Sequence, residues 1–273
     1  MSILRETRHA RPLARRSALR GLGTIGAWAL FLAIACALVP LSATAGEYAV
    51  SPLRIDLDRD TRSGAVTLTN SGADRMDFQI SVLEWTQDAE GRDRYTPTSE
   101  VVFFPKILTL QPGESRIVRA GVQSVPVAAE RTFRLFIEPI PTASREPLPP
   151  GASIAVTLRF ALPVFVKPAQ PKPAGEIENA GIGKGAATFT IRNTGNEHLK
   201  FEDGVAVVGR DAQGAEVFKE RIESRYVLAG VAKRLSGTIP AGACLRLATL
   251  EITARAEQFT LSRKLDVNRT HCE

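Results

Sequence analysis

The chain has 273 residues, which is enough for two domains of ordinary size. Most of its formal net charge of +6 comes from the first 45 residues, which hold six of the 35 lysines and arginines but only one of the 29 acidic residues. The remaining 29 basic and 28 acidic residues nearly balance, so there is no surplus of basic residues for a phosphate-binding surface, and a nucleic-acid partner is excluded.

Residues 1–45 have the pattern of an export signal. Arginines precede an apolar stretch, Leu22–Val39, and the segment ends in Ala43-Thr44-Ala45, which suits signal peptidase. The apolar stretch approaches the length of a membrane-spanning helix, but Pro40 and the small residues at its end favour cleavage before Gly46. We therefore expect a cleaved signal peptide. Its arginine pair leaves both general secretory and twin-arginine export open.

From Tyr48 onward, short runs rich in Val, Ile, Leu, Phe and Thr are separated by Gly, Asn, Asp and Pro, without sustained helical periodicity. This pattern is typical of β-strands. The strands predicted in the first half are Tyr48–Leu57, Ala65–Asn70, Met76–Trp85, Val101–Phe104, Ser115–Val122, Thr132–Glu138 and Ile154–Val166. Strands at this spacing, with Gly-containing and Asn-containing turns between them, indicate an immunoglobulin-like sandwich.

A proline-rich stretch, Lys167–Pro173, follows the last of these strands and predicts a domain boundary, because proline cannot donate to a central ladder. We expect one domain over residues 46–167 and a second over residues 168–273. The second half is also predicted to be all-β, with strands at Ala186–Asn193, Val205–Val208, Glu216–Phe218, Arg234–Thr238, Thr249–Ala254 and Phe259–Val267. The fold class expected is therefore two immunoglobulin-like β-sandwiches in tandem.

No catalytic constellation is apparent in the sequence after residue 45. Only His198 and His271 remain there, and neither has the spacing of a metal site. We expect no enzyme activity, cofactor, metal or small-molecule substrate. Cys244 and Cys272 form an even pair in an exported chain, so a disulfide is the first expectation, with free thiols or an intermolecular bond as the alternative.

The last strand of the first half carries a long apolar alternation. Its large side chains share one face because strand residues alternate with period two; they are Ile154, Val156, Leu158, Phe160 and Leu162. They could simply fill the core of this sandwich. However, prolines 139, 141, 147, 149 and 150 form a long approach that a routine hairpin does not need. That approach favours an edge strand to which a partner adds its own strand.

Several separated motifs resemble the periplasmic chaperones of the chaperone-usher pathway, in particular its archaic branch. The motifs run in order along the mature chain and are Val50–Ile55, Ala65–Asn70, Trp85, Phe104-Pro105, Leu110–Ser115, Val118-Arg119, Glu130, Phe133–Leu135, Glu138–Pro141 and Pro163–Pro168. The resemblance implies an L-shaped pair of sandwiches that acts in the periplasm. It also implies pilus subunits and an outer-membrane usher as partners, with the alternating face as the donated strand.

In well-known members, one arginine and one lysine anchor the carboxylate at the end of the subunit. Arg54 matches the arginine, but Pro163 occupies the position expected for the lysine. We predict that Arg134 replaces the lysine, with Arg119 and Arg159 as weaker candidates. Self-association through the donor strand is left open. The competing interpretations are a secreted adhesive or carbohydrate-binding sandwich and, less favoured, a periplasmic hydrolase.

Overall fold

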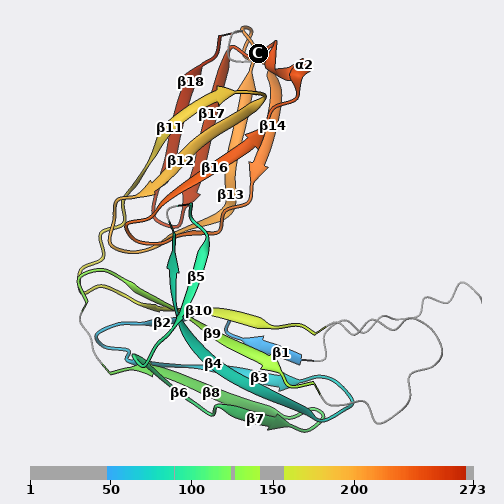
Figure 1. The fold of residues 1–273 in the computed structure, drawn as a ribbon, viewed down its shortest axis with the longest axis vertical. Helices are drawn as coiled ribbons and strands as arrows, with labels where there is room; N and C mark the ends of the chain where they lie inside the picture. Colours follow the sequence, from blue (N-terminus) through green and yellow to red (C-terminus); the bar gives the residue numbers. More distant parts are fainter. Residues whose placement is uncertain (1–47, 89, 124–126, 142–156, 269–273) are drawn as a thin grey trace, which may run out of the picture. The chain divides into compact units, whose positions relative to one another are not determined.

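The computed structural model describes residues 48–88, 90–123, 127–141 and 157–268. In these residues the chain forms strands β1–β10, which make one sandwich, and strands β11–β18, which make another (Figure 1). A single helical turn, α2 (Ala241–Cys244), is the one helix assigned in the described part. None of the described segments forms a helix that is long and apolar enough to cross a membrane.

The first sandwich consists of two sheets. One has the order β1-β3-β8-β6, and the other has the order β2-β10-β9-β4-β5 with β7 also paired to β4. The strands are β1 (Tyr48–Ser51), β2 (Ile55–Leu57), β3 (Ser63–Asn70), β4 (Met76–Gln87), β5 (Asp93–Pro97), β6 (Val101–Phe104), β7 (Ile107–Leu110), β8 (Ser115–Val122), β9 (Arg131–Pro139) and β10 (Phe160–Val166).

Alternating apolar residues close the core between these two sheets. Val66 and Leu68 of β3 are fully buried, as are Phe78 of β4 and Leu135 of β9. At the end of β3 the buried Asn70 donates from Nδ2 to the carbonyl of Asp74 at 2.7 Å, and its Oδ1 accepts from the amide of Gly72 at 2.9 Å. The Asn-x-Gly turn is therefore held by its own side chain.

The second sandwich pairs a sheet of order β11-β12-β16 with a sheet of order β14-β13-β17-β18, in which β15 also pairs with β13. Asn193 repeats the turn of Asn70: Nδ2 donates to the carbonyl of Glu197 at 2.8 Å, and Oδ1 accepts from the amide of Gly195 at 3.0 Å. The strands are β11 (Gly175–Gly183), β12 (Ala186–Asn193), β13 (Leu199–Arg210), β14 (Glu216–Ile222), β15 (Tyr226–Val227), β16 (Ala232–Thr238), β17 (Thr249–Ala256) and β18 (Thr260–Asp266).

The structure confirms the all-β fold class and corrects several predicted elements. The predicted strand Tyr48–Leu57 is two strands, because Pro52 interrupts the ladder and the chain passes from the sheet of β1 to that of β2. Strand β5 was not predicted, since all of its residues are exposed and it has no apolar alternation. Strands β7, β11 and β15 were also missed.

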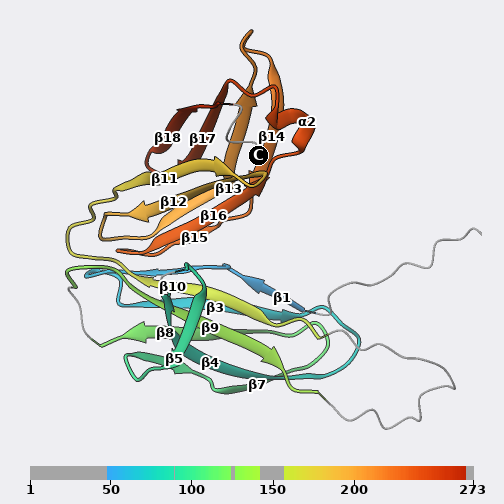
Figure 2. The ribbon, with the colours of Figure 1, turned by 45° about the horizontal axis from the view of Figure 1, so that its top comes forward.

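Strand β10 lies between β9 and β2 in its sheet. Figure 2 shows β10 next to β9. It begins at Phe160, later than predicted: Thr157, Leu158 and Arg159 are described and lie outside the strand. Residues 154–156 of the predicted strand fall outside the described residues.

Candidate functional site

Strand β10 has one edge that is covered over only half of its length. Strand β9 pairs antiparallel with all seven residues of β10, but β2 pairs in parallel with Val164–Val166 alone. The amide of Lys167 donates to the carbonyl of Leu57 on β2, so the main-chain groups of the odd-numbered residues face the β2 side. Among the described residues, no strand covers Phe160–Pro163 on that side. This half of β10 is an open sheet edge.

The segment that enters β10 is fixed by side chains of two neighbouring strands. The Tyr48 hydroxyl donates to the carbonyl of Leu158, and the Tyr48 ring packs edge-on against Phe160 at 5.3 Å between centroids. Burial, followed by the repulsion of Glu138, raises the pKa of Tyr48 to about 12, so the hydroxyl stays protonated. Arg159 lies 4.0 Å from the ring centroid of Phe136. Leu158 itself is 52% exposed.

At the other end of β10 an aromatic cluster joins residues of both sandwiches. Phe165 stacks on the ring of His198 at 3.8 Å and 11°, and Trp85 meets Tyr226 edge-on at 5.5 Å. Leu228 is buried with them. Aromatic contacts of this geometry add to the free energy gained from burial alone.

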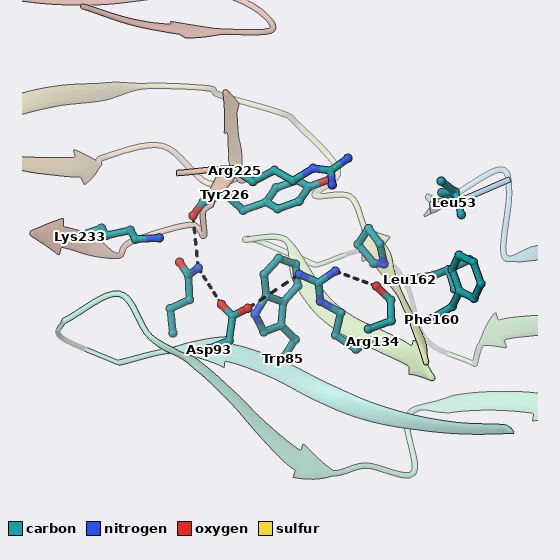
Figure 3. A pocket seen from close by; sticks show the side chains of 12 residues that line it. Leu53, Trp85, Asp93, Arg134, Phe160, Leu162, Arg225, Tyr226 and Lys233 are labelled. Atoms are coloured by element: carbon teal, nitrogen blue, oxygen red, sulfur yellow. Dashed lines mark hydrogen bonds and ion pairs between the residues drawn. The ribbon is translucent and has the colours of Figure 1, made fainter. Parts of the chain in front are cut away.

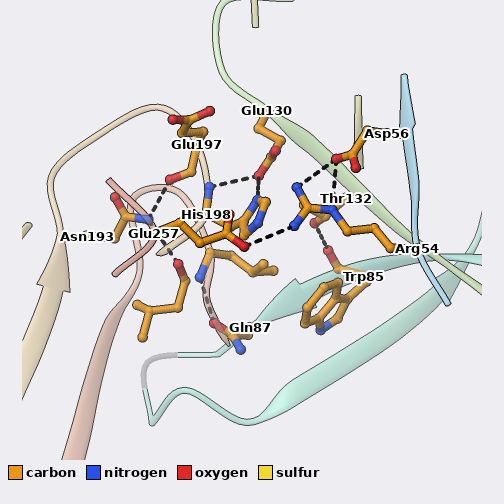
Figure 4. A network of polar contacts seen from close by, with 12 residues as sticks. Arg54, Asp56, Trp85, Gln87, Glu130, Thr132, Asn193, Glu197, His198 and Glu257 are labelled. Carbon is orange, nitrogen blue, oxygen red and sulfur yellow. Dashed lines mark hydrogen bonds and ion pairs between the residues drawn. The ribbon is translucent and has the colours of Figure 1, made fainter. Parts of the chain in front are cut away.

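Hydrogen bonds between polar groups around this cluster connect the two sandwiches (Figure 4). Glu130 Oε2 accepts from the main-chain amide of His198 at 2.8 Å and lies 2.8 Å from Nδ1 of the same residue. The Glu130 side chain is fully buried. Gln87 accepts from the amide of Leu228 at 3.0 Å and donates to the carbonyl of Tyr226 at 3.3 Å. Hydrogen bonds to Glu130 and Gln87 therefore join polar groups of the two sandwiches inside the junction.

Arg54 belongs to the same network. Its guanidinium donates to Asp56 at 2.8 and 2.9 Å, lies 3.8 Å from Glu257, and sits 4.9 Å from the centroid of Phe165. Burial opposes the charged form, but the hydrogen bond to Asp56 and the nearby carboxylates raise the pKa of Arg54 overall. The hydrogen bond from Lys200 lowers the pKa of Glu257. The half-buried Arg54 thus links the carboxylate of Asp56 in the first sandwich to that of Glu257 in the second.

A pocket of about 340 Å³ opens beside the uncovered half of β10 (Figure 3). Its cationic side chains are Arg134, Arg225 and Lys233, and its one carboxylate is Asp93. The other lining residues are Leu53, Trp85, Gln87, Phe160, Ala161, Leu162, Pro163 and Tyr226. The pocket is positively charged overall, and the open edge forms part of its wall.

Arg134 is held in one orientation within this pocket. Its guanidinium lies 3.7 Å from the centroid of the Trp85 ring, donates from Nη1 to the carbonyl of Ala161 at 3.2 Å, and lies 3.9 Å from Asp93. The side chain is only 12% exposed. The main-chain groups of odd-numbered residues in β10 face the β2 side. Arg134 therefore donates to a carbonyl group of the open edge, that of Ala161.

Comparison with known proteins finds a family that matches the first sandwich. Residues 48–172 match the family of pili and flagellar-assembly chaperones at its PapD N-terminal domain. The first sandwich is therefore an N-terminal domain of the pilus-assembly chaperones. The match favours a chaperone over an adhesive, a carbohydrate-binding protein or a hydrolase, and the family implies action in the periplasm.

Solved pilus chaperones share the fold of this chaperone at low sequence identity. The chaperone SafB of Salmonella enterica, in complex with the SafA pilin, is 12% identical with a TM-score of 0.52, covering 82% of this chain and 99% of its own. The YadV chaperone is 13% identical with a TM-score of 0.52, covering 81% of this chain and 100% of its own. The CupB2 chaperone of Pseudomonas aeruginosa is 13% identical with a TM-score of 0.50, covering 81% of this chain and 100% of its own. No curated protein matches the chain.

The predicted donor residues divide into three groups in the structure of the chaperone. Leu158 is half exposed and Phe160 partly buried, whereas Leu162 is 1% exposed and belongs to the core of the first sandwich. Ile154 and Val156 lie outside the described residues. Leu162 is therefore buried within the chaperone itself, because this face of β10 points into the core of the first sandwich.

The predicted anchor residues lie around one ring cluster but in different surroundings. Arg134 lines the pocket; Arg54 does not and is engaged by carboxylates instead. Sequence reasoning missed Arg225 and Lys233, which come from the second sandwich. No local motif marks them, and only their place in the fold brings them to β10.

The two remaining predictions of site residues concern the cysteines and the weaker cation candidates. Cys244 is buried at the end of α2, and Cys272 lies outside the described residues, so their pairing stays a prediction. Arg159 is 3.7 Å from Glu138, and Arg119 is exposed on β8, in the other sheet of the first sandwich. Neither lines the pocket.

Proposed function

We propose that this chaperone captures unfinished pilus subunits in the periplasm by adding the open edge of β10 to their sheet, and delivers them to an outer-membrane usher. The single observation that carries the proposal is the edge of Phe160–Pro163, which no described strand covers. An extended client chain could pair there through main-chain hydrogen bonds, while alternate side chains of the donor segment fill its groove. SafB, whose structure is that of a chaperone in complex with a pilin, supports this kind of client.

The proposed donor side chains are Ile154, Val156, Leu158 and Phe160. Leu162 is left out because it already fills the core of the first sandwich. Leu158 is 52% exposed, so about half of a leucine side chain is free to be buried by a client. Tyr48 and Arg159 support the proposal, since they hold the segment that enters β10 against β1 and β9.

For the anchor of the client we propose Arg134, with Arg54 supporting it from the far side of the Trp85 and Phe165 rings. Arg134 has the better geometry, because it lines the pocket beside the open edge. Arg54 is largely committed to Asp56 and Glu257. The planar guanidinium of Arg134 can bind a carboxylate through two parallel hydrogen bonds.

The remaining elements of the proposal concern processing and organisation. We propose a signal peptide over residues 1–45, domains over residues 46–167 and 168–273, and a disulfide between Cys244 and Cys272. The sheet pairing, which changes between Val166 and Gly175, supports a boundary in this stretch. Between clients, the open edge could pair with a second copy, and a concentration-dependent mass in light scattering tests that pairing.

Co-expression with a pilus subunit encoded beside the chaperone gene, followed by co-purification, tests the proposal. Leu158→Asp is expected to abolish the complex. Leu158→Ala removes the burial of about half a leucine, about 0.8–1.5 kcal/mol, and should weaken binding about fourfold to twelvefold. Leu245→Ala is the matched control, since Leu245 is 62% exposed on the second sandwich. Equal effects of the two alanine variants, or an unaltered complex with Leu158→Asp, would sink the proposal.

A further inference from the structure

We propose that the outer face of strands β6 and β8, together with the turn that leads into β7, docks on a membrane surface of anionic phospholipids. Strands β6 and β8 belong to the sheet that does not contain β10, so this surface is separate from the open edge. The inference goes beyond the proposed capture of subunits and does not depend on it. We call the surface the β6–β8 face; its apolar members are Val102, Phe104, Ile107 and Ile117, and its unpaired cations are Arg62, Lys106 and Arg119.

The four apolar side chains of the β6–β8 face are exposed to solvent. Phe104 is 76% exposed and Ile107 66%, and about half of Val102 and of Ile117 is exposed. The residues next to them in β6 and β8, such as Val118, point into the core instead, as period two requires. A single exposed apolar side chain is common on a protein surface, but several on one face mark an interaction surface.

Two open hollows make these side chains and cations contiguous. A hollow of about 970 Å³ is lined by Phe104, Ile107 and Ile117, and another of about 400 Å³ is lined by Phe104, Arg62 and Arg119. Both hollows share Phe104, which therefore stands between them. Arg119 of β8 is also the direct cross-strand partner of Phe104 in the sheet.

The charge of the β6–β8 face is positive. Within the part of the chain that the structure describes, Arg62, Lys106 and Arg119 form no ion pair with a carboxylate. The one carboxylate that lines either hollow, Glu114, is paired with Arg116 at 2.7 Å. Three positive charges are therefore left over on this face, although basic and acidic residues nearly balance after residue 45.

Exposed apolar side chains among unpaired cations are what an anionic lipid surface requires. The phosphates of the headgroups attract the cations, and aromatic and aliphatic side chains enter the boundary between headgroups and acyl chains. Strand β6 pairs only with β8 among the described strands, so its other edge has free main-chain groups. These groups must remain hydrated, which places the face at the level of the headgroups and not deeper.

The relief of the β6–β8 face favours a lipid surface over a folded protein. Its apolar side chains stand singly, with hollows and cations between them, and do not line one continuous groove for a helix or a strand. A fluid lipid surface adapts to such relief, whereas a protein partner would need a surface that matches it. The absence of unpaired carboxylates around the two hollows disfavours a second copy, because like charges would face each other.

Flotation of the mature protein with phospholipid vesicles tests the inference. Vesicles of phosphatidylglycerol and phosphatidylethanolamine should bind the protein, and vesicles of phosphatidylcholine alone should not. Binding should be lost when the salt concentration rises to about 0.5 M, because salt screens exposed charges. Equal binding to both kinds of vesicle would overturn the inference. No binding to the anionic vesicles would also overturn it, and would leave a protein as the occupant of the face.

Serine variants identify the apolar members. Phe104→Ser and Ile107→Ser should each weaken binding to the anionic vesicles about tenfold, since each side chain loses most of its gain from leaving water. Leu245→Ser is the matched control, because Leu245 is 62% exposed on the second sandwich, and it should leave binding unchanged. Wild-type affinity of Phe104→Ser and Ile107→Ser for the vesicles would refute the assignment of this face.

Glutamine variants identify the cations. Arg62→Gln and Arg119→Gln should each weaken vesicle binding about fivefold, the usual effect of one cation near an anionic membrane. Lys219→Gln and Arg263→Gln are the controls, since both residues are exposed on the second sandwich, and they should have little effect. Equal losses in all four variants would show that net charge alone causes binding, which overturns the inference. Because the assay contains no pilus subunit, its outcome is independent of strand donation.

Discussion

Replacing Glu130 by alanine removes the acceptor that joins the first sandwich to His198. The Glu130 side chain is fully buried, and its Oε2 accepts from the main-chain amide of His198 and faces Nδ1, both at 2.8 Å. Each hydrogen bond to a charged group contributes about 1.5–3 kcal/mol, and an alanine leaves both donors buried without a partner. The alternative acceptors are few, because Phe165 stacks on the imidazole at 3.8 Å.

We expect Glu130→Ala to lower the free energy of unfolding by about 2–4 kcal/mol, less than the sum of the two bonds because water can enter the gap. Glu130→Gln keeps an acceptor oxygen and should cost about 1 kcal/mol. Urea denaturation, followed by the fluorescence of Trp85 in the mature protein, measures both values, since Trp85 lies in the same aromatic cluster as Phe165.

Glu90→Ala is the control for this experiment. Glu90 pairs with Arg92 at 3.0 Å, but both side chains are more than half exposed, so its loss should change the free energy of unfolding by less than about 0.5 kcal/mol. The reasoning is refuted if Glu130→Ala and Glu90→Ala have the same free energy of unfolding, because the buried contacts of Glu130 with His198 would then contribute no more than an exposed ion pair.

Two further predictions concern charge. Arg134→Ala should weaken subunit capture more than Arg54→Ala in a pull-down, because only Arg134 lines the pocket, whereas Arg54→Ala should also lower the melting temperature; the opposite order of capture would reverse the proposed roles. Burial, followed by repulsion from Glu130, raises the pKa of Glu197 in the folded protein, so the stability linked to Glu197 is full below its unfolded pKa and is lost as the pH rises through the folded value. Glu197→Gln should therefore melt at a higher temperature than the wild type at pH 7 and at an equal one at pH 4, and a lower melting temperature at pH 7 would contradict this.

Local pattern was enough to predict much of the first sandwich. Strands such as β3 and β9 follow from their alternation of apolar side chains, since period-two burial is a property of the strand itself. The Asn-x-Gly turns after Asn70 and Asn193 were likewise visible, because a side chain that bonds its own main chain needs no distant partner. Strand β5 could not be predicted from the sequence, since its side chains are all exposed and show no apolar alternation.

The function of an apolar strand residue could not be read from its periodicity. Leu158 and Leu162 share one predicted face, yet the first is half exposed and the second is in the core. What separates them is that Leu162 lies within β10 and pairs with Leu135 of β9, whereas Leu158 precedes the strand. The start of that pairing is a tertiary fact with no trace in the sequence of β10.

The sequence by itself determined the two-sandwich fold, and it also predicts the export signal and the region of the donor strand, because all three depend on composition, periodicity and short motifs. The tertiary structure alone decided that half of β10 has an open edge and that Arg134, Arg225 and Lys233 surround one pocket beside it. Cations that lie far apart along the chain act together only when the fold brings them close, since electrostatic attraction depends on distance in space and not along the sequence.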